Sequence, residues 1–242
     1  MQKEHIFGLH AVNEALKANK NLSKVFIQNT ISSPKLKELM HLLKKNQVPY
    51  SIVPVQKLNK LTQQNHQGVL AQLDTISYGN LEQILEETPA SGLFLLLDGI
   101  TDTRNLGAII RSAAAAKATA VVIPTTGSAQ ITGETIKTSS GGVFQVPICR
   151  VNHLKDALYL LQSYEIQCVV ADEKTDNHIF SLDFKKPTAI VMGAEDKGVS
   201  SGVRKLCDET AKLPMLGDMD SYNVAVAAGM FLYEIMRQRT HQ

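Results

Sequence analysis

The stretch that decides the fold class is LFLLLDGITDTRNLGAIIRSA, residues 93–113. It opens with an apolar run that ends at Asp98, and a short run of this kind predicts a buried strand. A helical pattern then begins near Asn105. Three more apolar runs follow along the chain, AVVIP (120–124), CVVA (168–171) and AIVMG (189–193). Because these runs alternate with helical sequence, they predict an α/β fold with a parallel sheet covered by helices on both faces.

The loops that follow these strands are the expected place for chemistry. Ligands of parallel α/β sheets bind beyond the carboxyl ends of the strands, which are here Asp98, Ala171 and Gly193. The segment IVMGAEDKGVS, residues 190–200, runs from a strand into a turn between Gly193 and Gly198. Glycines there permit a close approach of the backbone to a ligand. The chain contains no GxGxxG and no GxxxxGK[ST] motif, which disfavours a dinucleotide or nucleoside triphosphate as that ligand.

A third segment, KLPMLGDMDSYNVAVAAGMFLYEIMRQR at 212–239, predicts a short strand, a loop and a helix for which Ser221 is an N-cap candidate. The apolar face of that helix, which predicts core or a dimer interface, comprises Val224, Ala227, Ala228, Phe231, Leu232 and Ile235. Several polar residues of these segments have an ordinary structural explanation beside a functional one. Helix capping accounts for Asn105, Ser221 and Asn223, and a surface ion pair accounts for Arg111.

The first 73 residues predict a small α/β domain of their own. Its expected elements are a helix at 9–18, a strand at 25–27, a helix from 34 with Leu36, Leu39, Met40 and Leu43 in register, and strands at 50–53 and 69–73. Residues 74–91, with Gly79 and Pro89 around a short acidic helical pattern, predict a linker. Residues 92–242 then form the parallel-sheet domain.

Charge is distributed unevenly between the two parts of the chain. Residues 1–80 hold ten lysines, no arginine and four acidic residues, for a net charge of +6, and the remainder carries −4. A polyanion such as RNA would be attracted to the N-terminal part first. A lysine-rich solvated surface explains the same distribution equally well.

Bulk composition excludes several other classes. The 242 residues are 44% hydrophobic and 20% charged, as expected of a globular protein. No apolar run approaches the roughly 20 residues that span a bilayer, and the first residues lack the apolar stretch of a signal peptide, so we expect a cytoplasmic protein. The cysteines at 149, 168 and 207 are scattered and predict core or surface thiols rather than a metal site or disulfides.

Together, the three segments resemble motifs 1, 2 and 3 of the SpoU/TrmH methyltransferases, a branch of the SPOUT superfamily. IFGLHAVNEAL at 6–16 and HQGV at 66–69 resemble the ends of that family's substrate-binding domain, so the resemblance covers essentially the whole chain. It implies a C-terminal domain with a deep trefoil knot and a smaller, ribosomal-protein L30e-like N-terminal domain. It also implies S-adenosylmethionine as methyl donor, no metal, RNA as substrate, and a homodimer formed through the C-terminal domain.

The resemblance also assigns site residues. The catalytic positions are Asn105, Arg111, Glu195, Ser221 and Asn223. The cofactor-binding positions are Gly193, Gly198, Leu213, Met215, Tyr222 and Val224. Because a guanidinium stays protonated, we hypothesise that the motif arginine clamps a phosphate and stabilises negative charge rather than acting as a base. For the motif glutamate we predict a positioning role through hydrogen bonds with the motif asparagine or the substrate.

The implied reaction is 2′-O-methylation of a ribose. The LDGITD and VMGAE motif starts and the extended N-terminal domain favour the branch that modifies a guanosine of 23S rRNA. Alternatives are a transfer-RNA or other ribosomal substrate, a non-catalytic RNA-binding protein, and a generic α/β enzyme of small molecules. The chain departs from the family pattern at Thr103, where proline is typical, and at Tyr222 and Ala225, where motif 3 typically has leucine and serine.

Overall fold

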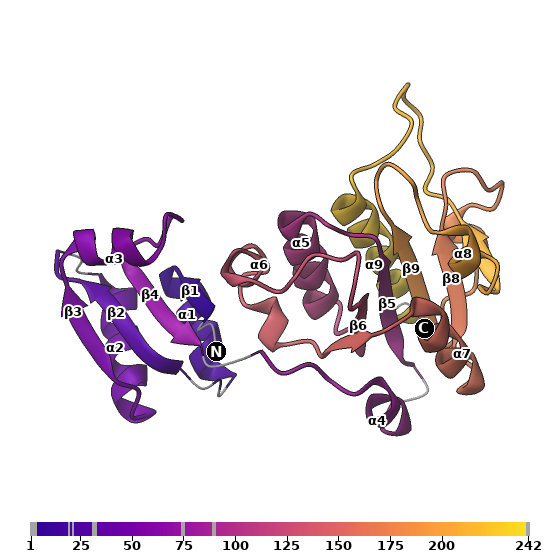
Figure 1. Cartoon of the computed structure of the whole chain (residues 1–242). Helices are drawn as coiled ribbons and strands as arrows, with labels where there is room; N and C mark the ends of the chain where they lie inside the picture. Colours follow the sequence, from indigo (N-terminus) through magenta and orange to yellow (C-terminus); the bar gives the residue numbers. More distant parts are fainter. Residues whose placement is uncertain are drawn as a thin grey trace. The chain divides into compact units, whose positions relative to one another are not determined.

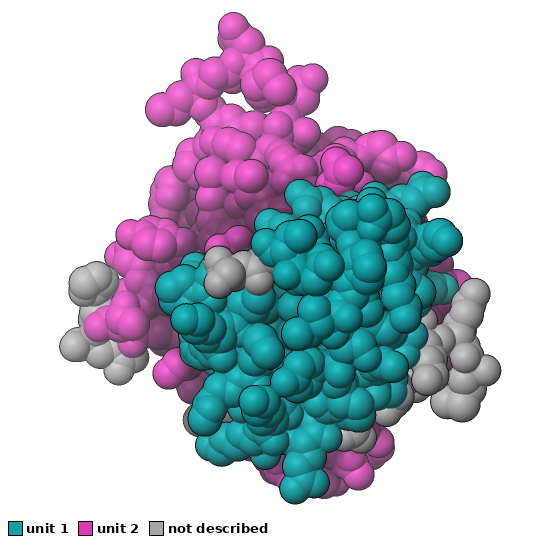
Figure 2. All heavy atoms as spheres, turned by 90° about the vertical axis from the view of Figure 1, so that its left-hand side faces the viewer, with its two compact units in different colours: residues 1–77, 130–145 teal, residues 78–129, 146–242 magenta. Residues whose placement is uncertain are grey.

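A computed structural model gives the fold, and it describes residues 4–18, 20, 22–30, 33–73, 76–88 and 91–240. The chain divides into two compact units (Figure 2). Unit 1 comprises residues 1–77 together with 130–145, and unit 2 comprises residues 78–129 together with 146–242. The chain therefore enters unit 1 twice.

Unit 1 is a four-stranded sheet with helices, labelled in Figure 1. In sheet order its strands are β1 (Glu4–Phe7), β4 (Val69–Leu73), β2 (Leu22–Gln28) and β3 (Tyr50–Val53). Strands β1 and β2 are antiparallel to β4, and β3 is parallel to β2. Its helices are α1 (Leu9–Lys17), α2 (Pro34–Lys45), α3 (Val55–Leu61), α6 (Gly133–Thr138) and the 3-10 turn η1 (Gly142–Phe144). The small α/β domain expected from the sequence is thus present.

Local sequence explains these helices. Ser33 caps α2 by accepting from the backbone N–H of Leu36, and Pro34 occupies the first turn, where a missing N–H costs nothing. The three leucines expected in register, Leu36, Leu39 and Leu43, are buried, whereas Met40 is partly exposed. Helix α3 contributes Leu58 to a cluster with Phe26 and Leu70 from the sheet.

Unit 2 is a six-stranded, wholly parallel sheet. In sheet order its strands are β10 (Glu209–Ala211), β8 (Gln167–Ala171), β9 (Thr188–Gly193), β5 (Leu93–Asp98), β6 (Ala120–Pro124) and β7 (Ile148–Val151). Its helices are α4 (Leu81–Glu86), α5 (Thr103–Ala115), α7 (Leu154–Ser163), α8 (Ser201–Arg204), α9 (Val224–Thr240) and the 3-10 turn η2 (Ile179–Ser181). The predicted parallel α/β class is confirmed, and the knot stays a prediction.

Helices cover the sheet of unit 2 because its strands are apolar on both faces. Helices α4, α7 and α8 bury Leu85, Leu158 and Val203 in one cluster with alternate residues of the strands. Helices α5 and α9 pack against each other (Figure 1). Most of the expected apolar face of α9 is buried, so that stripe is core. Within the predicted linker, α4 packs into unit 2, where Leu81 and Leu85 are buried.

Of the three capping candidates near the motifs, only Asn223 caps a helix. Asp102 caps α5, since its Oδ1 accepts from the backbone N–H groups of Arg104 and Asn105 at 2.8 Å each. Asn223 caps α9 through the N–H groups of Ala225 and Val226. The interpretation of Asn105 and Ser221 as caps is therefore wrong. Among the helices that the structure describes, none is long and apolar enough to cross a membrane.

Candidate active site

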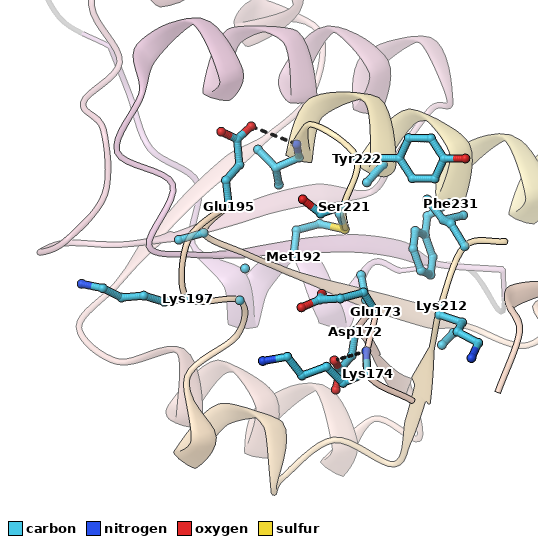
Figure 3. Close-up of a pocket in the computed structure, with 18 of the residues that line it drawn as sticks. Asp172, Glu173, Lys174, Met192, Glu195, Lys197, Lys212, Ser221, Tyr222 and Phe231 are labelled. Carbon is cyan, nitrogen blue, oxygen red and sulfur yellow. Dashed lines mark hydrogen bonds between the residues drawn. The ribbon is translucent and has the colours of Figure 1, made fainter. Parts of the chain in front are cut away.

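A pocket opens where strands β8, β9 and β10 end, which is the carboxyl edge of the sheet in unit 2 (Figure 3). Its empty space is about 720 Å³, part of it open to solvent. Its floor includes the apolar side chains of Met192, Leu213, Val224 and Phe231. The position agrees with the rule that ligands bind beyond the strand ends of a parallel sheet.

One wall of the pocket is a tight turn after β9. The backbone N–H of Gly198 donates to the carbonyl of Ala194 at 2.8 Å, and Gly198 has a left-handed φ of 64°. A Cβ on Gly193 would lie 2.1 Å from the carbonyl carbon of Gly198. Only glycine allows the two arms of the turn to come this close, which leaves backbone groups lining the pocket.

Three motif side chains meet beside this turn. Glu195 Oε1 accepts from Asn105 Nδ2 at 3.2 Å, from Asn223 Nδ2, and from the backbone N–H of Val224 at 3.1 Å. Asn223 Nδ2 also donates to Asn105 Oδ1 at 3.0 Å. The hydrogen bond between Asn105 and Glu195 that the sequence predicts is confirmed. The trio joins α5, the turn after β9 and the start of α9 into one polar cluster.

The expected cofactor-binding residues all lie at one place. The pocket is lined by Gly193, Gly198, Leu213, Met215, Tyr222 and Val224, together with the motif residues Glu195 and Ser221. The hydroxyl of Tyr222 donates to the carbonyl oxygen of Pro214 at 3.0 Å, which ties the loop before α9 to the segment after β10.

Arg111 lies apart from this lining. It is exposed on α5, six residues after Asn105, and it is not among the residues around the pocket. Six residues correspond to about 600° of rotation along a helix, so the two side chains leave α5 in directions about 120° apart. The geometry of one chain thus brings together four of the five motif residues.

The sequence missed a charged part of the pocket. Asp172, Glu173 and Lys174 follow β8 directly and line the pocket, as do Lys197 and Lys212. Figure 3 labels all five around the cavity. The signal was present, because Ala171 was recognised as a strand end where ligand loops are expected, and three charged residues come next.

The lining residues contain no histidine. Across the described ranges, no group of three or more His, Cys, Asp or Glu side chains is placed to hold a metal ion. A pocket of backbone groups, apolar side chains and a charged part, next to a hydrogen-bonded polar cluster, is typical of an α/β enzyme site for an organic ligand.

Comparison with known families identifies the class of enzyme. The model of the SpoU rRNA Methylase family matches residues 92–233, and the model for RNA 2′-O ribose methyltransferase substrate binding matches residues 5–79. The chain belongs to the SpoU rRNA Methylase family and carries the substrate-binding domain of RNA 2′-O-ribose methyltransferases. The resemblance drawn from the motifs is confirmed.

Relatives match the chain along almost its whole length. The 23S rRNA (guanosine-2′-O-)-methyltransferase RlmB of Pseudomonas putida is 36% identical over 242 residues, covering 98% of either chain. YacO of Bacillus subtilis, named only as a TrmH family tRNA/rRNA methyltransferase, is 33% identical over 241 residues, which are 98% of this chain and 97% of YacO.

Solved structures agree. The SpoU methyltransferase AviRb of Streptomyces viridochromogenes, in complex with AdoMet, has a TM-score of 0.85 and 26% identity, and the match covers 99% of this chain and 92% of AviRb. An AdoMet-bound rRNA methyltransferase of Sinorhizobium meliloti has a TM-score of 0.83 and 25% identity, with 97% and 87% covered. Two similar enzymes were therefore solved with AdoMet, which is S-adenosylmethionine, bound.

Proposed function

We propose that this chain transfers the methyl group of S-adenosylmethionine to the 2′-hydroxyl of a guanosine ribose in 23S rRNA, in the cytoplasm. The observation that carries the proposal is the Asn105–Glu195–Asn223 cluster, which stands beside a pocket lined by all six expected cofactor positions. The activity named for RlmB of Pseudomonas putida supports the guanosine and the 23S rRNA.

The pocket fits the cofactor. S-adenosylmethionine supplies a methyl group activated on a positively charged sulfur. The apolar floor around Leu213 and Phe231 suits an adenine ring, and the backbone around Gly193 offers hydrogen-bonding groups. The carboxylate of Glu173 at the pocket is suited to ribose hydroxyls or to the amino group of the methionine part, whereas the carboxylate of Asp172 already pairs with Arg204.

Within this site the chain's residues mainly position groups. Glu195 holds the side chains of Asn105 and Asn223 and the first N–H of α9 in one arrangement. Correct alignment of the ribose oxygen with the methyl group contributes several kcal/mol, about 7–11 at best. The cluster thus keeps the rim of the pocket in a single geometry before RNA arrives.

Removal of the hydroxyl proton needs a separate group. A guanidinium is a poor base because it stays protonated in proteins. In our proposal Arg111 instead binds a phosphate of the substrate bidentately and stabilises negative charge on the ribose oxygen, while the proton passes to phosphate or water. Ser221 at the pocket is a further contact to the reacting groups.

We assign RNA binding and methyl transfer to different parts of the chain. In our proposal residues 1–73 bind the RNA, residues 74–91 connect, and residues 92–242 carry the methyl transfer. The match of the substrate-binding model to residues 5–79 and the lysine excess of this part support the first assignment.

A homodimer formed through the C-terminal domain is part of the proposal. Helix α9 keeps large apolar side chains exposed after its core face is buried, with Val226 at 49%, Met230 at 38% and Tyr233 at 65% of full exposure. Leu216 and Met219 are exposed in the loop before it. A Tyr233→Glu variant of a dimer held this way would elute as a monomer, and an unchanged mass by light scattering would count against this surface.

The test of the function is methyl transfer from labelled S-adenosylmethionine to bare 23S rRNA, 16S rRNA and tRNA from a strain that lacks the host enzymes. We expect label at one guanosine ribose of 23S rRNA. Label in tRNA alone would show that the substrate is tRNA rather than 23S rRNA, while the proposed methyl transfer would stand. The name of YacO also allows this alternative. Cofactor binding without transfer to any RNA would favour a non-catalytic RNA-binding protein.

A further inference from the structure

Unit 1 holds an amide-rich loop between α3 and β4, residues 62–67, with the sequence TQQNHQ. Four of its side chains are exposed amides, Gln63, Gln64, Asn65 and Gln67, whereas His66 is buried with 9% exposure. Residues 55–68, which include α3 and the loop, contain two lysines and no acidic residue. Such a loop offers directional donors and acceptors without charge repulsion toward a polyanion.

The buried side chain of His66 holds the loop in place through two hydrogen bonds. Its Nδ1 accepts from the backbone N–H of Gly68 at 2.9 Å, so the remaining proton is on Nε2, which lies 2.9 Å from Asn59 Oδ1 and donates to it. Both ring nitrogens are used, and only the neutral form with this tautomer makes both bonds. The buried imidazole therefore links Asn59 of α3 to Gly68, the residue before β4, and so holds both ends of the loop that carries the four exposed amides.

The backbone of the loop is equally constrained. Gln67 has a φ of 49° and Gly68 a φ of 77°, so a non-glycine residue is held in the sterically disfavoured left-handed region. Thr62 Oγ1 accepts from the N–H of Gln64, and Asn65 Oδ1 accepts from the N–H of Gln67. The loop thus presents its glutamines from a defined shape.

A segment of the methyltransferase region supports the same loop. Lys137 of α6 donates from Nζ to the carbonyl oxygen of Asn65 at 2.7 Å, and its ammonium lies 5.2 Å from the centroid of the Phe7 ring. A Cβ on Gly133 would lie 2.1 Å from the carbonyl oxygen of His5, so α6 approaches β1 as closely as glycine permits. The loop and α6 form one surface within unit 1.

Cations flank the amides on both sides. Lys57 and Lys60 are exposed on α3, which leads into the loop, and Lys137 contacts it from α6. Lysines bind phosphates without regard to sequence, whereas amide side chains form specific hydrogen bonds with base edges, as glutamine does with adenine. In RNA these edges are accessible where nucleotides are unpaired.

We propose that loop 62–67, shaped by His66 and Lys137, reads unpaired bases of the RNA substrate and so selects the RNA segment that is methylated. The inference rests on the proposed function, because it assigns substrate selection to a surface of the same enzyme. It places the specificity-determining side chains at Gln63, Gln64 and Gln67, with Lys57 and Lys60 binding the adjoining phosphates.

The test uses the full-length enzyme with Gln63, Gln64 and Gln67 replaced by alanine. The matched control is Gln47→Ala, because Gln47 is also exposed in unit 1 and also has a left-handed φ, of 54°. We expect the triple variant to raise KM for 23S rRNA by about tenfold or more, as expected for loss of at least one specific base contact. Its kcat at saturating RNA, its affinity for S-adenosylmethionine and its Tm should match those of the control.

A KM within twofold of the control would overturn the proposal. Failure of the proposed function is distinguishable, because the wild-type enzyme would then methylate no 23S rRNA, whether it methylated another RNA or none. In that event, gel-shift titrations with 23S rRNA compare the RNA affinity of the triple variant with that of Gln47→Ala directly. Equal affinities would again overturn the assignment of RNA selection to loop 62–67.

Discussion

The side-chain amide of Asn223 donates a hydrogen bond to the side-chain oxygen of Asn105 at 3.0 Å, although 118 positions separate the two residues in the sequence. The same Asn223 caps α9 with its Oδ1 and donates to Glu195 with its Nδ2. One side chain therefore ends a helix and joins two motif residues. The start of α9 and the polar cluster therefore depend on the same side chain, that of Asn223.

Replacing Glu195 with glutamine should slow methyl transfer. The amide keeps the size of the side chain but loses the charge that strengthens three hydrogen bonds, those from Asn105, Asn223 and the N–H of Val224. We expect kcat to fall by about tenfold or more while RNA affinity is unchanged. Single-turnover methylation and gel shifts measure the two quantities, and Asp218→Asn in the loop before α9 is the control. Full activity of Glu195→Gln would sink the positioning role.

Arg111→Lys tests the bidentate phosphate contact. Lysine keeps the positive charge but cannot reproduce the planar fork of the guanidinium, so we expect kcat/KM to fall by about a hundredfold, or roughly 2.7 kcal/mol. Because Arg111 is exposed, the Tm should not change. Near-normal turnover of the lysine variant would show that the fork is not needed.

Gly193→Ala should weaken cofactor binding. Its Cβ would overlap backbone atoms of Gly198 and Val199, at 2.1 and 2.2 Å, so the turn that walls the pocket must open. We expect the affinity for S-adenosylmethionine, measured by calorimetry, to fall by about tenfold or more. Gly217→Ala is the matched control, since a Cβ there meets nothing within 4 Å. Equal affinity of the two variants would contradict this account of the turn.

Arg239→Ala should destabilise the fold without touching the site. The guanidinium donates to the carbonyl oxygens of Ser91, Phe184 and Lys186 at 2.6 to 2.8 Å, which ties the end of α9 to segments before β5 and β9. Removing it leaves the partly buried carbonyl of Phe184 without this donor and ends two more exposed hydrogen bonds, and we expect a loss of about 1–3 kcal/mol in urea unfolding. Arg237→Ala, which removes only an exposed pair with Glu234, should change little.

The thiols should be unreactive in the folded protein. Burial raises the pKa of Cys149 from 9.0 to about 11 and, together with Asp208, that of Cys207 to about 12; it also raises the pKa of Cys168. Neutral thiols react slowly, so a thiol reagent at pH 8 should label the native enzyme slowly and all three cysteines in denaturant. Stability that the buried thiols contribute is complete below pH 9.0 and is lost as the pH rises through their folded pKa values. Rapid labelling of the native enzyme at pH 8 would contradict the prediction that the buried thiols are unreactive.

The sequence predicted the four central strands of the sheet in unit 2 well and the details at helix starts poorly. Of the two edge strands, β7 was not predicted, and the short strand expected after residue 212 lies instead at Glu209–Ala211. Strands at 93–98 and 120–124 have the predicted bounds, because an apolar run between polar loops defines both ends. The cap of α5 was misassigned because Asp102 and Asn105 are both good capping residues three positions apart, and local preference does not choose between them.

Nonlocal packing was out of reach of sequence patterns. Nothing in GETIKT indicates that α6 packs on β1 of unit 1, since that contact depends on Gly133 meeting His5 across more than a hundred residues. The pocket residues that follow β8 were missed for a similar reason. Consecutive charged residues are typical of a solvated turn, and only the folded structure shows that these line the same pocket as the ends of β9 and β10.

The double passage of the chain through unit 1 has a consequence for engineering within this family. A chimera that exchanges residues 1–77 alone would place a foreign domain against the native α6. The close fit of Gly133 against the backbone of His5, and of Gly141 against the side chain of Glu14, would be lost. Substrate preference should therefore be transplantable between relatives only as two separate inserts, the N-terminal block and residues 130–145, moved together. Under our proposal, the part of this chain that selects the RNA is encoded by two separate segments of the gene.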